Sequence, residues 1–421
     1  MAKFLVQNSG PLNGEVVISG AKNAVLPLMA ATLLSEEHCE LSDVPALRDV
    51  EVMKEILQSI GAKVTEKSSS VLDIETKEIL NCEADYELVT KMRASFLVMG
   101  PLLARTGRAK VYSPGGCTIG ARPIDLHLKG FEALGADIVV KDTYVEAVAP
   151  EGGLVGASIY LDFPSVGATE NIMTAAVLAK GTTYIENAAE EPEIVDLAVL
   201  LNKMGARVKG AGTDTIKIEG VEKLRSVQHT VIPDRIEAGT FMLAAAITKG
   251  TILLKNIVPD HVKSIIAKLR ECGVQIEITD EGMYVIAENS HLVATDIKTL
   301  PYPGFPTDIQ SPFMSFLTVV EGSSTVIETV FENRFMHVAE LNRMGANIKT
   351  EGNRAMIQGG KKLEGAQVIA TDLRAGAALV LAGLVAEGTT EISEIYHIER
   401  GYEKFVEKFR ALGANILRIE D

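Results

Sequence analysis

One short phrase recurs six times along the 421-residue chain, and this repetition limits the possible fold more than any other feature of the sequence. Each copy carries a glycine in the same setting, as in MGARV at Met204 and LGANI at Leu412. The glycines lie at intervals of 74, 70, 68, 72 and 68 residues and are Gly61, Gly135, Gly205, Gly273, Gly345 and Gly413. Self-similarity at a fixed period indicates a repeat architecture, so the sequence predicts six copies of a unit of about 70 residues.

The content of each unit follows from its hydrophobic pattern. An amphipathic run of helical period precedes each repeated glycine, as in PEIVDLAVLLNKMGA, so the glycine is expected to end a helix. Two short alternating segments follow and predict a pair of strands. An earlier helix, apolar nearly all round, ends at a second set of glycines, which are Gly107, Gly181, Gly250, Gly322 and Gly388. With a lead-in strand, each unit is predicted to be βαβαββ.

The fold class predicted from these units is α/β. The first helix of each unit is apolar on all sides and belongs inside, whereas the second is amphipathic and belongs nearer water. Six units divide most simply into two lobes of three, with residues 22–230 in the first lobe and residues 231–421 in the second. The change of lobe is expected near SVQHTVIP, Ser226 to Pro233. A cleft between two lobes is the usual place for a ligand, so we expect the active site there.

Composition excludes several classes of protein. The net charge of −15 disfavours nucleic acid and anionic membranes as partners. The four cysteines, Cys39, Cys82, Cys117 and Cys272, show no CxxC spacing, so neither a disulfide framework nor a zinc site is indicated. No apolar run is long enough for a membrane span, and MAKFLVQ lacks the apolar core of a signal peptide. These observations predict a cytoplasmic protein.

The stretch SPGGCTIGARP, residues 113–123, places a thiol in a glycine-dense loop. Its glycines allow the backbone to approach a ligand closely. Lys110 and Arg122 flank Cys117, and nearby positive charge is expected to lower the thiol pKa from about 8.5 towards neutrality. The alternative is that Cys117 is a small buried residue of a structural loop.

Charged residues fall at two registers of the repeat, both predicted to lie at helix starts. Counted back 14 residues from the second set of glycines are Arg93, Gly167, Asp308 and Arg374; counted back 13 from the first set are Arg48, Arg122 and Arg400, with Arg334 at 11. Lys22 likewise opens a helix. Free N–H groups at several helix starts, joined by arginines, can converge on one anion. The alternative, ordinary charges on solvated helices, explains the pattern less well because cations are disfavoured at helix N-termini.

Asp308 is the one carboxylate in its register. It is a candidate general base that takes a proton from a substrate hydroxyl. Asp308 also fits a purely structural role as a helix cap, which aspartate often fills. His127 and His337 lie within predicted site helices and fit either a site role or packing.

The motifs of this chain resemble those of the UDP-N-acetylglucosamine 1-carboxyvinyltransferases, within the enolpyruvyl transferase family. The resemblance extends over the whole chain and rests on SGAKNA, MRAS, SPGGCTIGARPIDLH, SVGAT, NAAEEPEIVD, PDRIEAGTF, FPTDIQ, ETVFENRFMH, ATDLRA and YHIERGYE, in the same order. The related shikimate-pathway synthase has no such cysteine loop, so SPGGC argues against that branch.

The resemblance implies a two-lobed inside-out α/β barrel in which residues 1–21 pack with the second lobe. It implies transfer of the enolpyruvyl group of phosphoenolpyruvate to the 3′-hydroxyl of UDP-N-acetylglucosamine, the first committed step of peptidoglycan precursor synthesis. The reaction releases phosphate by addition and elimination through a tetrahedral ketal. No metal or organic cofactor is implied. Family members with a cysteine in this loop are alkylated by the antibiotic fosfomycin, so Cys117 is expected to react.

The resemblance also implies roles for single residues. Asp308 is the expected base and Cys117 the general acid, able to form a covalent phospholactoyl adduct; Lys22 and Arg400 complete the catalytic set. Expected phosphoenolpyruvate ligands are Lys22, Asn23, Arg122, Arg334, Arg374 and Arg400, with Asp372 beside Arg374. Expected UDP-N-acetylglucosamine ligands are Arg93, Arg122, Pro123, Ile124, Asp125, Leu126, Ser165, Val166, Gly167, Asp308 and Val330. Some relatives have a lysine where this chain has Phe163, so no nucleotide contact is assigned there.

Three other functions remain open at this point. They are an enolpyruvyl transferase that acts on a different acceptor, a non-catalytic paralogue that binds a UDP-sugar, and an interaction scaffold built from repeats. A pure sensor has no need of the Cys117 thiol or the Asp308 carboxylate, and a scaffold leaves the glycine loop and the cations without purpose.

Overall fold

The computed structural model describes residues 2–112 and 124–420. The chain divides into two compact units. We call residues 20–112 and 124–232 the N-terminal unit, and residues 2–19 and 233–420 the C-terminal unit. The N-terminal unit thus extends two residues beyond the expected first lobe, residues 22–230, at each end.

The described part of the N-terminal unit contains three sheets, with strand orders β13-β3-β5-β4, β6-β8-β7 and β11-β12-β10-β9. The strands are β3 (His38–Ser42), β4 (Lys63–Ser68), β5 (Val71–Glu75), β6 (Arg108–Tyr112), β7 (Asp137–Val140), β8 (Tyr144–Val148), β9 (Ser158–Tyr160), β10 (Thr182–Glu186), β11 (Arg207–Lys209), β12 (Thr215–Glu219) and β13 (Val227–Thr230). The helices are α1 (Lys22–Ala31), η1 (Thr32–Leu34), α2 (Arg48–Ile60), α3 (Tyr86–Lys91), η2 (Arg93–Val98), α4 (Met99–Thr106), α5 (Asp125–Ala133), α6 (Val166–Ala176) and α7 (Pro192–Lys203).

The C-terminal unit has three sheets within its described residues, with strand orders β15-β16-β14-β2, β17-β18-β20-β19 and β21-β22-β1-β23. Its strands are β1 (Lys3–Gln7), β2 (Asn13–Val17), β14 (Thr251–Lys255), β15 (Gln275–Thr279), β16 (Gly282–Ile286), β17 (Ile297–Lys298), β18 (Ser323–Ile327), β19 (Ile348–Glu351), β20 (Arg354–Gln358), β21 (Gln367–Ile369), β22 (Thr389–Ser393) and β23 (Asn415–Ile419). Its helices are α8 (Arg235–Thr248), η3 (Pro259–Val262), α9 (Lys263–Glu271), α10 (Thr307–Val319), α11 (His337–Arg343), α12 (Leu373–Gly383), α13 (Tyr396–Glu399) and α14 (Phe405–Ala411).

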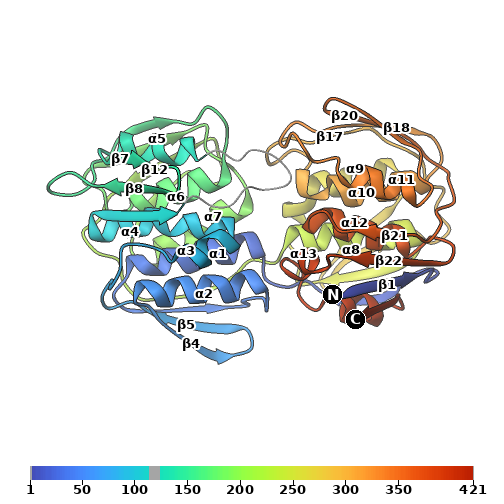
Figure 1. Cartoon of the computed structure of the whole chain (residues 1–421), viewed down its shortest axis with the longest axis horizontal. Coiled ribbons are helices and arrows are strands. Elements are labelled where there is room, and N and C mark those ends of the chain that lie inside the picture. The colour runs from blue at the N-terminus through green and yellow to red at the C-terminus, as the bar shows by residue number, and fades with distance from the viewer. Residues whose placement is uncertain (1, 113–123, 421) are drawn as a thin grey trace. The chain divides into compact units, whose positions relative to one another are not determined.

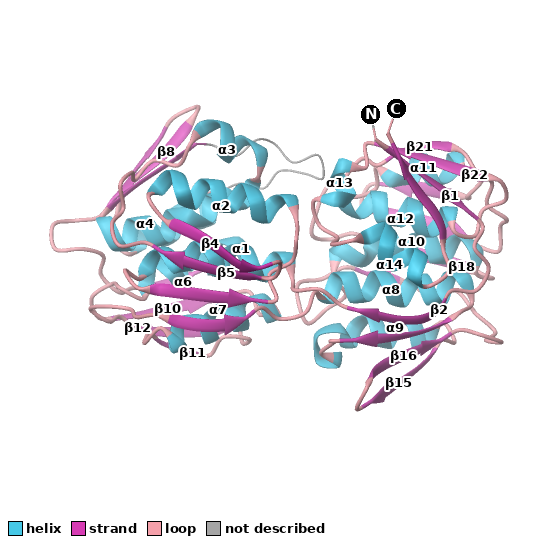
Figure 2. Cartoon of the chain, turned by 90° about the horizontal axis from the view of Figure 1, so that it is seen from below, coloured by secondary structure: helices cyan, strands magenta, loops and turns pink. Residues whose placement is uncertain are grey.

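Within each unit, sheets form the outside and the apolar helices lie between them (Figures 1 and 2). Helices α8, α10 and α12 contact one another at the centre of the C-terminal unit, and almost all of their residues are buried. Helices α1 and α6 are buried in the same way in the N-terminal unit. The expectation that the first helix of each 70-residue repeat lies inside is confirmed for these five helices.

All six repeated glycines adopt left-handed backbone conformations at helix ends, with φ between 92° and 118°. In each case the residue after the glycine donates its backbone N–H to the carbonyl five residues earlier, at 2.9 to 3.1 Å. These bonds satisfy carbonyls that a helix end otherwise leaves unpaired, and glycine carries no Cβ strain in this conformation. The predicted role of the glycines is confirmed.

The second set of glycines ends a helix as predicted only at Gly107, which caps α4. Helices α6, α10 and α12 end at Ala176, Val319 and Gly383, before Gly181, Gly322 and Gly388. Lys249, not Gly250, takes the left-handed conformation after α8, with φ 54°. Gly250 is required for space instead, because a Cβ there would lie 1.9 Å from the backbone oxygen of Leu12.

The lead-in strands of the repeats pair with strands that are far away in the sequence. Strand β2 directly precedes α1 in the chain, yet it pairs in parallel with β14 of the C-terminal unit. The corresponding place beside β3 is taken by β13. In the sheet of β6 the lead-in segment is reduced to a single bridge between Glu83 and Lys110. No helix in the described residues is long and apolar enough to cross a membrane.

Candidate active site

The expected site residues are distributed over both units. Cys117, Arg122 and Pro123 lie outside the described residues. Asp308, Val330, Arg334, Arg374 and Arg400 belong to the C-terminal unit, and the other expected ligands belong to the N-terminal unit.

Asp308 lies at the second position of α10 and pairs with two arginines. Its Oδ1 accepts a hydrogen bond from Nη2 of Arg334 at 2.9 Å, and its Oδ2 accepts from Nε and Nη2 of Arg374 at 3.3 and 3.2 Å. The two guanidinium groups are 2% and 4% exposed, whereas the carboxylate is 25% exposed. The N-cap residue of α10 is Pro306, so Asp308 is not the N-cap of its helix. The register of the repeat thus identified three residues that meet in space.

Arg374 is held by its helix and by an aromatic ring. Asp372 caps α12 by accepting hydrogen bonds from the backbone N–H groups of Arg374 and Ala375, at 2.9 and 3.1 Å. The Tyr402 ring lies 5.3 Å from Cζ of Arg374. Burial acts to lower the pKa of Arg374, but Tyr402 and the Asp308 charge more than offset it, and the net shift is upward. Arg374 therefore stays charged under all working conditions.

Arg334 and Arg374, beside Asp308, have N–H donors that no described residue accepts from. Nε and Nη1 of Arg334 and Nη1 of Arg374 are buried and have no hydrogen-bond partner among the described residues. Buried guanidinium N–H groups are normally paired, and arginine suits the oxygens of phosphate and carboxylate groups. This surplus of buried donors is suited to an anion.

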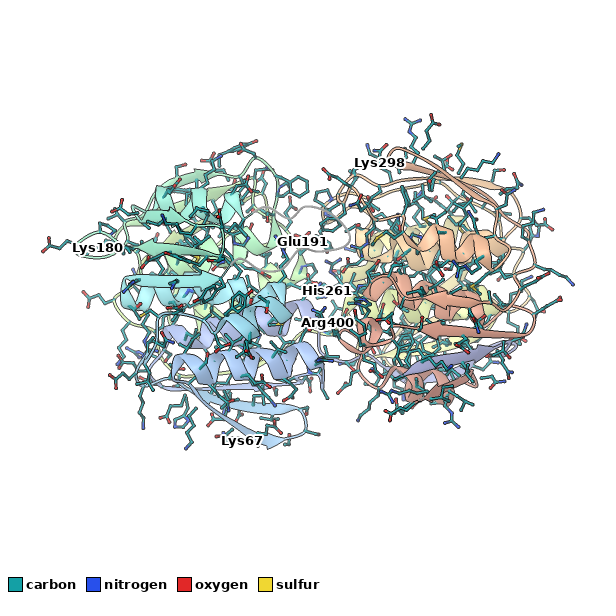
Figure 3. The ribbon with its side chains drawn as sticks, in the orientation of Figure 1. Lys67, Lys180, Glu191, His261, Lys298 and Arg400 are labelled. Carbon is teal, nitrogen blue, oxygen red and sulfur yellow. The ribbon has the colours of Figure 1, made fainter. Side chains whose placement is uncertain are left out.

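Arg400 does not begin a helix, contrary to the sequence prediction. It follows α13, a single turn, as its C-terminal capping residue, and the next helix starts only at Phe405. Arg334 also precedes its helix, since α11 begins at His337. Arg400 is half-buried and is labelled in Figure 3. Burial, followed by the charge of Arg400, lowers the pKa of the nearby His397.

In the N-terminal unit, Lys22 begins α1 as predicted. Its Nζ lies 2.7 Å from Oδ2 of Asp49 in the first turn of α2, and both side chains are largely buried. The neighbouring Asn23 and Arg48 are exposed. Sequence reasoning missed Asp49, although an acid in the first turn of an amphipathic helix beside Arg48 was a visible signal.

A second group in the N-terminal unit surrounds His127. Burial, and next the charge of Arg93, lowers the pKa of His127 to about 3, so the ring is neutral. Its Nδ1 lies 3.1 Å from Nδ2 of Asn171, and a Cβ on Gly167 would lie 3.3 Å from its Cε1. His127 therefore links the start of α5 to the start of α6, where two of the expected nucleotide-binding stretches lie.

These two stretches sit at helix starts. Ile124 precedes α5, whose first residues are Asp125 and Leu126. Ser165 caps α6, and its Oγ accepts a hydrogen bond from Ala168 N at 3.3 Å; Val166 and Gly167 follow as the first helical residues. Arg93 begins the 3₁₀ helix η2, as predicted for a helix start.

Lys110, which is expected to support the Cys117 thiolate, forms an ion pair with Glu83. Nζ of Lys110 lies 2.9 Å from Oε1 of Glu83 and 4.5 Å from the centre of the Tyr144 ring. Tyr112 donates to the same carboxylate oxygen at 2.6 Å. The Lys110 charge is therefore paired with the Glu83 carboxylate, and its expected effect on the Cys117 pKa concerns a residue outside the described ranges.

Glu328 is a further residue that sequence reasoning did not single out. It directly follows β18, is buried, and accepts hydrogen bonds from the backbone N–H groups of Val330 and Phe331 at 2.7 and 3.2 Å. It therefore shapes the turn that carries Val330, an expected ligand.

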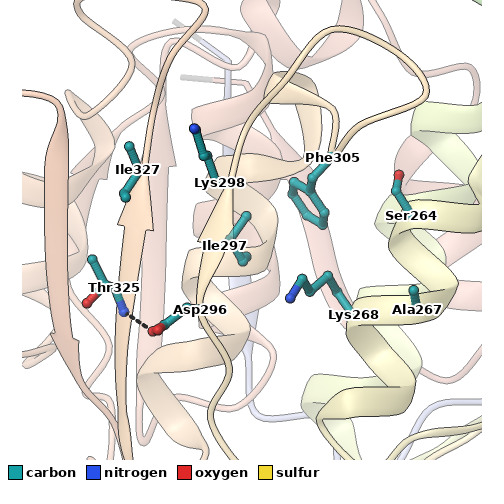
Figure 4. A pocket seen from close by; sticks show the side chains of 9 residues that line it. All are labelled: Ser264, Ala267, Lys268, Asp296, Ile297, Lys298, Phe305, Thr325 and Ile327. Carbon is teal, nitrogen blue, oxygen red and sulfur yellow. Dashed lines mark hydrogen bonds between the residues drawn. The ribbon is translucent and has the colours of Figure 1, made fainter.

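One pocket of the C-terminal unit is separate from these residues. It has a volume of about 520 Å³ and lies between α9 and the strands β17 and β18 (Figure 4). Ile297 and Phe305 form an apolar wall, with Lys268 and Lys298 nearby. None of the expected site residues lines it. The described residues also contain no group of three or more His, Cys, Asp or Glu side chains that could hold a metal ion.

The family model of EPSP synthase (3-phosphoshikimate 1-carboxyvinyltransferase) matches residues 6–409. A UDP-N-acetylglucosamine 1-carboxyvinyltransferase 1 from Caldanaerobacter subterraneus subsp. tengcongensis is 64% identical and covers 99% of both chains. The chain belongs to the EPSP synthase family of enolpyruvyl transferases. This enolpyruvyl transferase is also 60% identical to the UDP-N-acetylglucosamine 1-carboxyvinyltransferase 2 of Carboxydothermus hydrogenoformans, over 100% of both chains. It is 59% identical to the UDP-N-acetylglucosamine 1-carboxyvinyltransferase of Finegoldia magna, over 100% of this chain and 99% of the relative.

Solved structures agree with the fold of this enolpyruvyl transferase. The enolpyruvyl transferase NikO from Streptomyces tendae has a TM-score of 0.86 at 23% identity, covering 99% of this chain and 98% of that chain. An EPSP synthase from Acinetobacter baumannii has a TM-score of 0.78 at 18% identity, covering all of both chains. At such identities the likeness concerns the fold alone, and it confirms the predicted fold class.

Proposed function

We propose that this enolpyruvyl transferase moves the enolpyruvyl group of phosphoenolpyruvate to the 3′-hydroxyl of UDP-N-acetylglucosamine and releases phosphate. The observation that carries the proposal is the end-to-end match, at 59 to 64% identity, to three relatives that bear the name of this activity. The ion-paired Asp308 beside buried arginines with unused donors fits a reaction between a hydroxyl and an anion.

The addition step needs an acid and a base on different atoms. We assign the Cys117 thiol as the donor that protonates C3 of phosphoenolpyruvate, which makes C2 cationic. The 3′-oxygen of the sugar then bonds to C2, and its proton passes to Asp308. The product is a tetrahedral ketal that still carries the phosphate.

The elimination step reverses the proton transfers. The Cys117 thiolate takes a proton back from C3, the bond between C2 and the phosphate oxygen breaks, and Asp308 returns its proton to the leaving phosphate. We assign Lys22, Asn23, Arg122, Arg334, Arg374 and Arg400 to phosphoenolpyruvate, because fixed positive charge stabilises the anionic groups through both steps. Arg93, residues 122–126, residues 165–167, Asp308 and Val330 are assigned to the sugar nucleotide.

Several further assignments rest on the same resemblance. We place the reaction between the two lobes, in the cytoplasm, at the first committed step of peptidoglycan precursor synthesis. We expect fosfomycin to alkylate Cys117. The enzyme is proposed to need neither a metal nor an organic cofactor.

The test is phosphate release from phosphoenolpyruvate, measured with and without UDP-N-acetylglucosamine, for the wild type and for Cys117→Ala. Release that needs both substrates and collapses in the variant supports the transferase and its thiol together. Shikimate 3-phosphate as the acceptor is the control for a different substrate. Binding of the sugar nucleotide without phosphate release from the wild type would instead indicate a non-catalytic paralogue.

A further inference from the structure

Glu328 carries a buried carboxylate that is satisfied without any cation. The residue is 3% exposed, and its four hydrogen-bond donors among the described residues are all uncharged. Its Oε1 accepts hydrogen bonds from Oγ1 of Thr299, at 2.7 Å, and from the two backbone N–H groups of its own turn; Oε2 accepts from Oγ1 of Thr307 at 2.9 Å. A buried carboxylate is costly unless such donors compensate it, so its place in the fold has a specific cause.

The four donors come from three separate segments. Thr299 lies just beyond β17, Val330 and Phe331 lie in the loop after β18, and Thr307 is the first residue of α10. Thr307 directly precedes Asp308, the proposed base. The single carboxylate therefore connects the loop of an expected acceptor ligand to the helix turn that carries the base.

The same loop is tied to α10 a second time at its far end. Arg334 donates to Asp308 at 2.9 Å, and the Phe331 ring lies 5.5 Å from Cζ of Arg334. Residues 328–334 are thus fixed at both ends to adjacent residues of one helix turn, Glu328 to Thr307 and Arg334 to Asp308. A shift at the Thr307 contact changes the angle between the base and the Val330 turn.

We propose that Glu328 is a positioning residue that aligns the Asp308 base with the loop that presents the acceptor hydroxyl. The inference rests on the proposed function and adds to it a residue that touches no substrate. Catalysis by proximity demands near-attack geometry, and small misplacements lower turnover strongly. This role depends on the length of the Glu328 side chain, which bridges two segments. The charge of its carboxylate is secondary.

Two pairs of variants test this inference. Thr307→Val keeps the shape but removes the hydroxyl that Oε2 accepts from, whereas Thr307→Ser keeps the hydroxyl. Glu328→Asp keeps the charge but is one methylene shorter, so it cannot span both segments. Glu328→Gln keeps the reach, because its oxygen can accept at the Oε1 position and its amide can donate to the Thr307 hydroxyl.

The expected result is a fall in kcat of about tenfold for Thr307→Val and Glu328→Asp, with the KM for phosphoenolpyruvate unchanged. Thr307→Ser and Glu328→Gln should stay within about threefold of the wild type. Melting temperatures of all four variants identify any that do not fold, and the other pair then decides. Wild-type kcat in Thr307→Val, or Glu328→Asp as active as Glu328→Gln, would overturn the inference. Failure of the wild type to release phosphate with UDP-N-acetylglucosamine would refute the proposed function instead, before any variant is compared.

Discussion

Asp308 is bonded on both oxygens to buried arginines, so its replacement tests chemistry and charge together. We expect Asp308→Asn to lower kcat by about 10² to 10⁴ while UDP-N-acetylglucosamine still binds, because the amide keeps the shape but cannot act as the base. Steady-state kinetics and calorimetric binding measure the two effects. Glu332→Gln, at an exposed position in the neighbouring loop, is the matched control. Unchanged turnover in Asp308→Asn would exclude this residue as the base.

The cysteines differ enough to predict which one fosfomycin modifies. Burial raises the pKa of Cys39 and of Cys272 to about 12, so neither thiol is nucleophilic near neutral pH. Cys82 is partly exposed and lies 3.4 Å from Oγ1 of Thr106. We expect a single adduct, on Cys117, detected by peptide mass spectrometry.

The control for this experiment is Cys82→Ser, which should leave both labelling and inhibition as in the wild type. Cys117→Ala should remove the adduct. An adduct on any other cysteine would show that the loop composition around residue 117 does not activate its thiol.

At the scale of single residues, the sequence predicted charged residues that recur at similar positions of the repeat. It did not predict Glu328, whose partners are hydroxyl and backbone groups. Asp308 and Arg374 were found because equivalent helix starts recur along the chain, and Arg334 was found near the second register although it precedes its helix; the three residues do meet. The partners of Glu328 are two threonines and two backbone N–H groups, which leave no charge pattern to read. The ion pair of Lys110 was not predicted because its partner, Glu83, lies 27 positions away.

At the element scale, the repeated helix ends give a stability prediction. Gly205 has φ 103°, and a Cβ there would meet nothing within 4 Å, so any cost of substitution is backbone strain alone. We expect Gly205→Ala to lower the free energy of unfolding by about 1–2 kcal/mol, and Gly205→Asn to lower it less, since asparagine tolerates this conformation better. Denaturant unfolding measures both. Equal stability of the alanine variant and the wild type would contradict the role of this glycine.

A buried pair between α8 and α14 predicts a dependence of stability on pH. Glu237 accepts hydrogen bonds from Lys408 Nζ at 2.5 Å and from Ser19 N at 2.7 Å. Burial raises the pKa of Glu237 from 4.5 to about 7, despite the opposing effect of Lys408. The folded protein therefore holds a proton that the unfolded chain has lost between these two pH values. The contribution of Glu237 to stability is full below pH 4.5, falls as pH rises to about 7, and is constant above it.

The measurement is the melting temperature of the wild type and of Glu237→Gln between pH 5 and 8. The wild type should lose stability relative to the variant as pH rises towards 7, and the difference should then level off. Glu407→Gln, on the exposed side of α14, should show no such trend. A difference that does not change with pH would show that Glu237 does not titrate in this range.

Local pattern predicted the long elements and failed where pairing is non-local or helices are short. The apolar helices and the glycine ends follow from periodicity over neighbouring residues. Arg400 was misplaced because α13 has only four residues and ends directly before it. The pairing of β2 with β14 joins segments more than 230 positions apart, which no local pattern encodes.

At the scale of the whole molecule, the chain begins and ends in the same unit. Strand β1 lies between β22 and β23, so the first residues complete the last sheet. The two segments that leave the N-terminal unit run side by side, since Ala21 N donates to Ile232 O at 2.7 Å and Asp234 N donates to Ser19 O at 2.8 Å. Within residues 2–112 and 124–420, the chain passes between the units through this one pair of segments, while the expected catalytic groups are divided between the units.

This division predicts that substrate changes the dimensions of the molecule. Lys22 and the expected nucleotide-binding stretches belong to one unit, and Asp308, Arg334, Arg374 and Arg400 to the other. Because the proposed reaction needs both groups around one pair of substrates, we expect UDP-N-acetylglucosamine to reduce the radius of gyration measured by small-angle X-ray scattering. An adenine nucleotide at the same concentration is the control and should leave the scattering unchanged. Saturating UDP-N-acetylglucosamine with no compaction would mean that the free protein already holds the two groups at their working distance, and the closure hypothesis would fail while the proposed reaction stood.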